Sequence, residues 1–426
     1  MRRLMIAAAI LALAACSKEQ AHHAKESAKG TAHSVAAKVS HVVDAVTTPA
    51  FAPEKVDVRQ REQQRFDARW RQLQSFRAEQ LRQQQAAQQQ QQQQPATDIQ
   101  FVTGVKQSFK HLDVNGINTA PVSVPITGDV RGPSVLKAQV YLDRLHFSVG
   151  SLDGRWGRNS AITVWWWQRS HGMQATGDVD EATFRSIADA AGAPPAVVAH
   201  QLTADDIKGP FVHIPDVVYD QQSLECLCYE SLREKLAEMF HCTEDFLELL
   251  NPNVKFSELQ AGQSINVPNV RGPMTTDQHD IAKVVISIAG NSFNAFDANG
   301  NLIFHAPTTL GSGYDPSPDE TVKVVKVIDH PHFHYDPTLY HEVPDWKPDA
   351  ELNPGPNSPV GVVWMALSKP HYGIHGTKDP DAIGYASSHG CVRLTNWDAA
   401  EVEHRISEGV LVSFVDTPHG GEHDRT

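Results

Sequence analysis

The most constraining feature of the sequence is a change in the pattern of apolar and turn-forming residues at about Asp280. Beyond that point, short β-branched or apolar runs are separated by Gly, Pro, Asn and Asp, which is the pattern of strands joined by turns. Asp297-Ala-Asn-Gly300 is typical of a hairpin turn, and residues 397–408 have the pattern of one helix. We therefore predict a mostly-β unit over residues 278–416 and a polar tail over 417–426. The predicted strands cover residues 284–288, 292–296, 322–328, 362–365 and 410–415.

Two units with helical patterns precede this β-rich part. Residues 131–192 are predicted to hold three helices. The first has an apolar period near 3.6 through Leu136, Leu142 and Leu145, the second covers 159–168, and residues 176–183 turn into the third. Asp178 or Asp180 is available as the N-cap of the third helix. Residues 212–270 form the second unit. Its predicted elements are helices over 231–240 and 243–250 and a short strand that ends the unit near residue 268.

The N-terminus has the pattern of a targeting segment rather than of a folded unit. Two arginines precede a short apolar run, which closes with the small residues of Leu13-Ala-Ala-Cys16. This resembles a bacterial lipoprotein signal over residues 1–15, cleaved before Cys16, whose thiol is then acylated; an ordinary secretory signal is the alternative. Ser17 stands where Asp would favour the inner membrane. The resemblance therefore implies a periplasmic protein, anchored through its lipid in the inner leaflet of the outer membrane of a Gram-negative bacterium.

Residues 16–130 are predicted to be a disordered to helical, Gln-rich linker. No run of about 18 or more apolar residues follows the N-terminus, so no internal membrane span is expected. The net charge of −13 argues against nucleic acid as the main partner.

The segment between His375 and Cys391 points to chemistry. His375 stands sixteen residues before Cys391, which is flanked by His389, Gly390 and Arg393. A thiol is a weak nucleophile at its ordinary pKa, and a neighbouring imidazole or cation raises its thiolate fraction. Glycines next to such a pair let the backbone approach a tetrahedral intermediate closely. The segment therefore predicts a cysteine acyl-transfer site.

The β-rich unit resembles the L,D-transpeptidase catalytic domain along its whole length. The resemblance is carried by Tyr372-Gly-Ile-His375-Gly376, by Ile383-Gly384 and by Ser388-His-Gly-Cys391-Val-Arg393. Residues 311–316 and 354–361 also look like segments of that family. The resemblance implies a β-sandwich or barrel-like catalytic domain within a multidomain α+β chain.

Carried over residue by residue, the resemblance implies that Cys391 is the nucleophile and His375 the general base. The carbonyl of Gly376 would orient His375, which is the role of a carboxylate in other triads. The backbone N–H groups of Cys391 and Gly390 would face the oxyanion. His389 is an alternative base, since residues i and i+2 of a strand share a face. The supporting residues are Ser388, His389, Gly390, Tyr372 and Arg393, the last of which suits either a substrate carboxylate or the carbonyls of its own loop.

The implied reaction is transpeptidation of peptidoglycan without a metal or organic cofactor. Cys391 would form a thioester with a tetrapeptide stem, D-Ala would leave, and the amine of another stem would take the acyl group in a 3-3 cross-link. Water as acceptor would make the protein an L,D-carboxypeptidase or endopeptidase. A protein lysine as acceptor would attach a lipoprotein to the wall, and hydrolysis of such a bond would detach it. Carbapenem-type inhibitors are expected to acylate Cys391, and a non-catalytic wall-binding scaffold is a further alternative.

The two helical units also resemble known modules. Residues 131–192 closely resemble the peptidoglycan-binding type 1 module, with Trp167-Gln168 in place of its Phe-Gln element. This resemblance implies that Trp167 lies in the core, and it leaves Trp165 and Trp166 either buried or available for stacking on sugars. Residues 212–270 look like a degenerate LysM module, a βααβ glycan binder whose opening strand is not recognisable here. That unit is either a glycan-binding site or a spacer.

The cysteines suggest one disulfide. The sequence has five cysteines, and Cys16 and Cys391 have other predicted roles. In an oxidising compartment we therefore expect Cys226 or Cys228 to bridge to Cys242, with a metal site as the alternative.

Three alternating histidines raise the question of a metal. His330, His332 and His334 would share one face of a strand, which suits a transition metal. Pro331 interrupts a regular strand, and the L,D-transpeptidases have a Pro- and aromatic-rich run here near the substrate cleft. We therefore predict no metal site.

Overall fold

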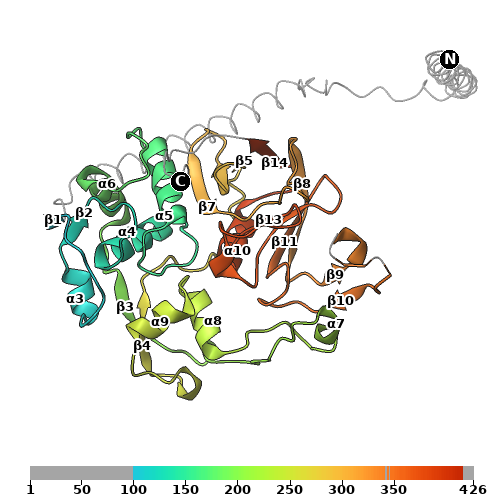
Figure 1. Ribbon diagram of the computed structural model, residues 1–426, viewed down its shortest axis with the longest axis horizontal. Helices are drawn as coiled ribbons and strands as arrows, with labels where there is room; N and C mark the ends of the chain where they lie inside the picture. Colours follow the sequence, from blue (N-terminus) through green and yellow to red (C-terminus); the bar gives the residue numbers. More distant parts are fainter. Residues whose placement is uncertain (1–98, 341–342, 345, 416–426) are drawn as a thin grey trace, which may run out of the picture. The chain divides into compact units, whose positions relative to one another are not determined.

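The computed structural model describes residues 99–340, 343–344 and 346–415 (Figure 1). The predictions on the signal segment, Cys16, the Gln-rich stretch and the polar tail lie outside these residues. Among the described helices, none is long and apolar enough to cross a membrane.

The described end of the predicted linker is folded, which corrects the boundary at residue 130. Strand β1 (Phe101–Thr103) pairs in parallel with β2 (Val122–Val124), and helix α3 (Val114–Thr119) lies between them. Ile117 and Ile126 are buried in the same core as the helices that follow. The elements are too short to stand out as periodic patterns, and their pairing is visible only in the fold.

Three helices follow, as predicted for residues 131–192. Asp180, rather than Asp178, caps the third helix, because its side chain accepts a 2.7 Å hydrogen bond from the backbone N–H of Thr183. Gly192 ends that helix with a left-handed φ of 73°. The helices are α4 (Pro133–Arg144), α5 (Arg158–Ser170) and α6 (Glu181–Ala191).

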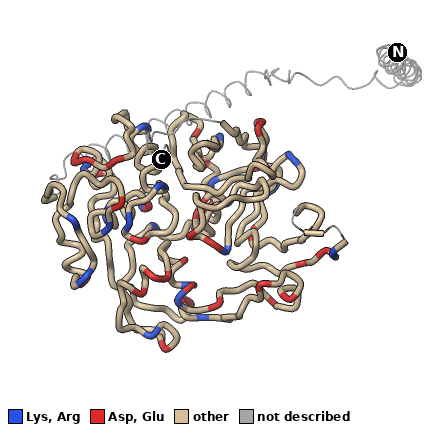
Figure 2. The backbone as a smooth tube through the Cα atoms, in the orientation of Figure 1, with Lys and Arg blue, Asp and Glu red and all other residues tan. Residues whose placement is uncertain are grey.

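The second helical unit has the order βααβ. Its last strand, β4 (Ser264–Pro268), pairs antiparallel with β3 (Val197–Gln201). Helix α8 (Leu232–Met239) begins at a capping box, and α9 (Glu244–Leu250) is capped by a threonine side chain. The opening strand thus lies upstream of the predicted start at residue 212, because an insertion that includes α7 (Val218–Gln221) separates it from α8. Figure 2 shows acidic residues outnumbering basic ones through the α8–α9 segment. The LysM-like assignment remains a prediction.

The C-terminal unit is built on one eight-stranded sheet, in the order β13-β12-β11-β8-β14-β5-β6-β7. The prediction of a mostly-β domain with one helix is confirmed. Strand pairs β12/β13 and β14/β5 are parallel, and the other neighbours are antiparallel. The strands are β5 (Lys283–Ser287), β6 (Ser292–Phe296), β7 (Leu302–Pro307), β8 (Val322–Asp329), β11 (Val363–Leu367), β12 (Gly373–His375), β13 (Val392–Arg393) and β14 (Leu411–Val415).

Outside this sheet, β9 (Phe333–Tyr335) and β10 (Ala350–Leu352) form a separate antiparallel pair, which α7 contacts. Helix α10 (Asn396–Arg405) packs on β11 and β12. Its buried Ala399 and Val402 join the apolar core of the sheet. The helix therefore lies directly against the strand that carries His375.

A buried ionic cluster joins the three units. The guanidinium of Arg271, in the segment after β4, contacts Asp143 of α4 and both Asp398 and Glu401 of α10. All four side chains are nearly inaccessible to solvent. His241, in the turn between α8 and α9, also contacts Asp143 at 2.9 Å. The helical units and the C-terminal unit therefore share a charged core.

Candidate active site

The predicted base and nucleophile lie on neighbouring strands. In the parallel pair β12/β13, Ile374 faces Val392 and His375 faces Arg393. Cys391 immediately precedes β13, and the backbone of Gly373 forms a hydrogen bond with it. Alternate residues of a strand share a face, so Cys391 and His375 lie diagonally across this pair.

His375 is held as a neutral imidazole. Its Nδ1 donates to the carbonyl of Gly376 over 2.6 Å, which leaves Nε2 with the free lone pair. The ring is buried and stacks on Trp364 at a centroid distance of 5.3 Å. Burial and the charge of Arg393 lower the pKa of His375 to about 3, although the Gly376 carbonyl opposes the shift. The predicted orienting role of Gly376 thus has its contact in the structure.

Cys391 is a protonated thiol at rest. Burial raises the pKa of Cys391, and neither the Gly373 backbone nor the charge of Arg393 reverses that shift. Its Sγ lies 3.7 Å from the carbonyl oxygen of His371, which it can donate to. The sequence led us to expect neighbours that raise the thiolate fraction, and the structure differs because desolvation outweighs them. The proton must therefore leave as the thiol attacks.

The turn before Cys391 is shaped by Ser388 and Gly390. The Ser388 hydroxyl donates to the Cys391 carbonyl at 2.6 Å and accepts from the Gly390 N–H at 3.2 Å. Gly390 has a φ of 104°, and a Cβ there would lie 2.7 Å from the ring of Tyr372. The Gly390 N–H, predicted to face the oxyanion, is thus engaged within the turn, which leaves the Cys391 N–H as the candidate donor.

His389 and Arg393 have different surroundings. The ring of His389 packs edge-on against Tyr340 at a centroid distance of 4.8 Å. The Arg393 backbone forms 2.9 and 3.1 Å hydrogen bonds with Thr309. Its Nε is buried and has no hydrogen-bond partner among the described residues. The backbone therefore ties this strand to the fold, and the guanidinium keeps capacity for a carboxylate.

Asn396, at the start of α10, is a site residue that sequence reasoning missed. Its Oδ1 accepts from the backbone N–H groups of Val362 at 3.2 Å and Thr377 at 3.1 Å. A Cβ at Gly361 or Gly376 would lie 2.1 or 2.2 Å from this oxygen. The sequence did offer one signal for this contact. Gly361 and Gly376 both lie in motif segments, and glycine is required where another group approaches the backbone this closely.

The alternating histidines do not converge on one point. His334, on β9, contacts Glu351 of β10 at 2.6 Å, whereas His330 occupies a turn with φ of 46°. Within the described ranges, no three His, Cys, Asp or Glu side chains are arranged to hold a metal ion.

The expected pairing of Cys242 is wrong. Cys226 and Cys228 form a disulfide with each other, and Cys242 is a buried free thiol. Leu227, between the paired cysteines, packs with β10, while Cys242 belongs to the core of the helical units. The two regions have separate cores, which keeps the thiols apart.

The three consecutive tryptophans of α5 are all buried. The core position of Trp167 is confirmed, and Trp165 and Trp166 are only 7% and 8% exposed. The Trp166 Nε1 donates to the Ser292 hydroxyl of β6 at 3.1 Å. The alternative of a sugar-stacking surface is therefore wrong, because all three rings are buried in the core of the helical units and Trp166 also bonds to β6.

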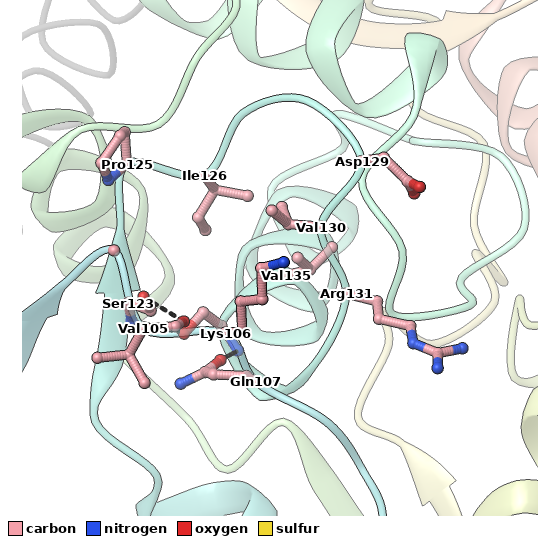
Figure 3. A pocket seen from close by; sticks show the side chains of 12 residues that line it. Val105, Lys106, Gln107, Ser123, Pro125, Ile126, Asp129, Val130, Arg131 and Val135 are labelled. Atoms are coloured by element: carbon pink, nitrogen blue, oxygen red, sulfur yellow. Dashed lines mark hydrogen bonds between the residues drawn. The ribbon is translucent and has the colours of Figure 1, made fainter.

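An open pocket lies where the β1–β2 region meets the first helical unit. Figure 3 shows side chains of the β1–β2 region and the start of α4 around a pocket of about 350 Å³. Lys106, Asp129 and Arg131 supply its charged groups.

Two parts of the chain match family models, and the site described above lies in the C-terminal one. Residues 282–413 match the family model described as the L,D-transpeptidase catalytic domain, and residues 131–187 match a putative peptidoglycan binding domain. The chain is similar to a putative L,D-transpeptidase of Bacillus licheniformis, at 29% identity over 181 residues that cover 42% of this chain and 92% of that protein. A putative L,D-transpeptidase of Bacillus subtilis is 28% identical over 179 residues, covering 42% of this chain and 90% of that protein.

Among solved structures, an L,D-transpeptidase from Mycobacterium smegmatis is 19% identical, with a TM-score of 0.27, and the match covers 36% of this chain and 63% of that chain. The chain thus spans less than two thirds of that solved protein, whereas it spans nearly all of the two Bacillus relatives. Residues 282–413 therefore belong to the L,D-transpeptidase family, and the chain joins this catalytic domain to a putative peptidoglycan binding domain.

Proposed function

We propose that Cys391 forms a thioester with a peptidoglycan tetrapeptide stem and passes the acyl group to the amine of a second stem. The observation that carries this proposal is the 2.6 Å hydrogen bond from His375 Nδ1 to the Gly376 carbonyl. It fixes the tautomer whose Nε2 can take a proton, on the strand beside the thiol.

The first half-reaction moves one proton through His375. As Sγ of Cys391 bonds to the carbonyl carbon before D-Ala, the thiol proton passes to Nε2 of His375. The carbon–nitrogen bond to D-Ala then breaks, and the imidazolium returns the proton to the leaving amine. The Cys391 N–H would stabilise the oxyanion, and Arg393 would bind a stem carboxylate.

The second half-reaction depends on the acceptor. An amine of a neighbouring stem gives the 3-3 cross-link, and its extra proton leaves through His375. Water would instead give a shortened stem, and a protein lysine would give a wall-bound lipoprotein. We favour the stem amine because the chain joins this domain to a putative peptidoglycan binding domain. Anchoring through a lipid on Cys16, in the periplasmic leaflet of the outer membrane, is part of the same proposal.

The test combines the protein with purified disaccharide-tetrapeptides and follows the products by mass spectrometry. We expect dimers that have lost one D-Ala, and none with Cys391→Ala. His375→Gln, which keeps a polar side chain but not the base, should lower the rate by about 100-fold or more. Tripeptide products without dimers would assign the hydrolytic alternative. Dimers formed equally by Cys391→Ala would refute the proposal.

A further inference from the structure

The segment between the base and the nucleophile, residues 376–390, rests on α5 of the peptidoglycan-binding unit. The side-chain amide of Asn159 donates to the carbonyl of Ile383 at 2.9 Å. The guanidinium of Arg158 donates to the carbonyl of Gly384 at 3.2 Å. Both carbonyls belong to the Ile383-Gly384 element of the catalytic motif.

Gly384 makes this approach possible. Its φ is +83°, and a Cβ there would lie 2.3 Å from Oδ1 of Asn159. Asn159 is itself buried, at 8% exposure. Residues 376–390, called the catalytic loop below, therefore pack against the first turn of α5 at van der Waals distance.

The loop also completes the helix. Gly157, the N-cap of α5, supplies no side-chain cap. The hydroxyl of Tyr385 accepts from the backbone N–H groups of Arg158 and Asn159. These groups are among the orphan donors of a helix N-terminus, so the catalytic loop satisfies them in place of a local cap.

Helix α5 is in turn fixed to the catalytic sheet. Besides the bond from Trp166 to β6, the Thr163 hydroxyl lies 3.2 Å from Nε2 of His305 on β7, and both residues are fully buried. On the loop's other side, the Gly384 N–H donates to the Thr309 hydroxyl at 3.1 Å, and the Thr309 N–H donates to the Arg393 carbonyl at 3.1 Å. A continuous set of contacts thus runs from α5 to the strand that follows Cys391.

We propose that Asn159 is a positioning residue for the acyl-transfer site, and that the peptidoglycan-binding unit supports catalysis through α5 irrespective of any affinity for the wall. The inference rests on the proposed function, since it concerns how that site is held. An error of about 1 Å in the placement of reacting groups can cost about 100-fold in rate.

The test measures two reactions of Cys391 in the full chain. Acylation by a carbapenem, followed by intact-protein mass, needs the whole site. Alkylation by iodoacetamide needs only an accessible thiol. For Asn159→Ala we expect acylation to slow by about 10- to 100-fold and alkylation to change by less than about twofold. Tyr385→Phe removes only one hydroxyl from a largely exposed ring and should slow acylation by about two- to tenfold.

The matched control is Asn118→Ala. The Asn118 amide also ties a helix to another unit's backbone, donating to the Val197 carbonyl at 2.8 Å, but it does so on α3 and away from the catalytic loop. This variant should be acylated at the wild-type rate. Equal slowing in both Asn variants would mean a general loss of stability and would overturn the inference, as would wild-type acylation of Asn159→Ala. Failure of the wild-type protein to be acylated would instead overturn the proposed function, and this inference with it.

Discussion

Replacing Arg271 with Met should be among the most damaging single changes outside the active site. The Arg271 Nη2 lies 2.5 Å from Asp398, its Nε lies 2.6 Å from Glu401, and it also contacts Asp143. Burial alone would raise the pKa of Asp143, but Arg271 and His241 hold it below its usual range. Methionine keeps the length of the side chain and removes the charge, so three buried carboxyl groups lose their shared cation.

Two independent estimates give a similar loss of unfolding free energy for Arg271→Met. Removing one partner of a buried ion pair costs about 3–5 kcal/mol. A stranded carboxyl can limit this cost by binding a proton. From an ordinary Asp pKa of 3.8 this costs about 4 kcal/mol at pH 7, at about 1.36 kcal/mol per unit. At pH 5 the same step costs about 2 kcal/mol. We therefore expect about 4 kcal/mol of lost stability at neutral pH, roughly halved at pH 5.

The direction of this pH dependence follows from the link between a group's pKa and the free energy of unfolding. In the wild-type protein the depressed pKa of Asp143 contributes stability at neutral pH that is lost as the pH falls. In the variant the pKa of the buried carboxyl rises, so at lower pH it binds a proton and its uncompensated charge disappears. The difference in unfolding free energy between variant and wild type therefore becomes smaller as the pH falls.

Urea unfolding followed by tryptophan fluorescence, at about pH 7 and about pH 5, would measure both quantities. The control is Arg233→Met, because Arg233 also joins two carboxylates, at 2.6 and 2.9 Å, but its side chain is 40% exposed. An exposed pair of this kind is worth about 0–1 kcal/mol. A loss below about 1 kcal/mol for Arg271→Met, or a loss that does not change with pH, would refute the reasoning.

Three further predictions follow from the site and the cysteines. Because burial lowers the pKa of His375 to about 3, the acylation rate should not fall as the pH drops from about 8 to about 5; a tenfold fall per unit below about pH 6.5 would indicate an unshifted imidazole. Gly361→Ala should lower the unfolding free energy by about 2–4 kcal/mol, since the φ of Gly361 is +61° and the new Cβ would lie 2.1 Å from a side-chain oxygen. The control Gly262→Ala, at a φ of +90° with open space around it, should cost only about 1 kcal/mol. Equal losses in urea unfolding of the two variants would contradict the steric argument. Among the described cysteines, alkylation of denatured, unreduced protein should label only Cys242 and Cys391, and mass-mapped labelling of all four would contradict the disulfide.

Local patterns were sufficient for much of the fold. The strands β5, β6, β8, β11 and β14 lie within a residue or two of their predicted ranges, because each is a β-branched or apolar run bounded by turn residues. Strands β12 and β13, which carry the site, were not predicted, since they have three and two residues and depend on their neighbours for pairing. The opening strand β3 was missed for a similar reason: its partner β4 lies beyond two helices and a long insertion.

The sequence by itself determined the chemistry, because Cys391, His375 and the glycines around them form a short motif whose roles depend on residue type and spacing. Only the tertiary structure decided the protonation state of the reacting groups and the contacts that hold them in place. Desolvation, rather than the adjacent cations, controls the Cys391 thiol, and the amount of desolvation depends on which distant segments cover it. The support of the catalytic loop by Asn159 and the cluster around Arg271 likewise join residues more than 100 positions apart. Contacts of that separation leave no periodic trace in the chain, so they became visible only when the fold brought the residues together.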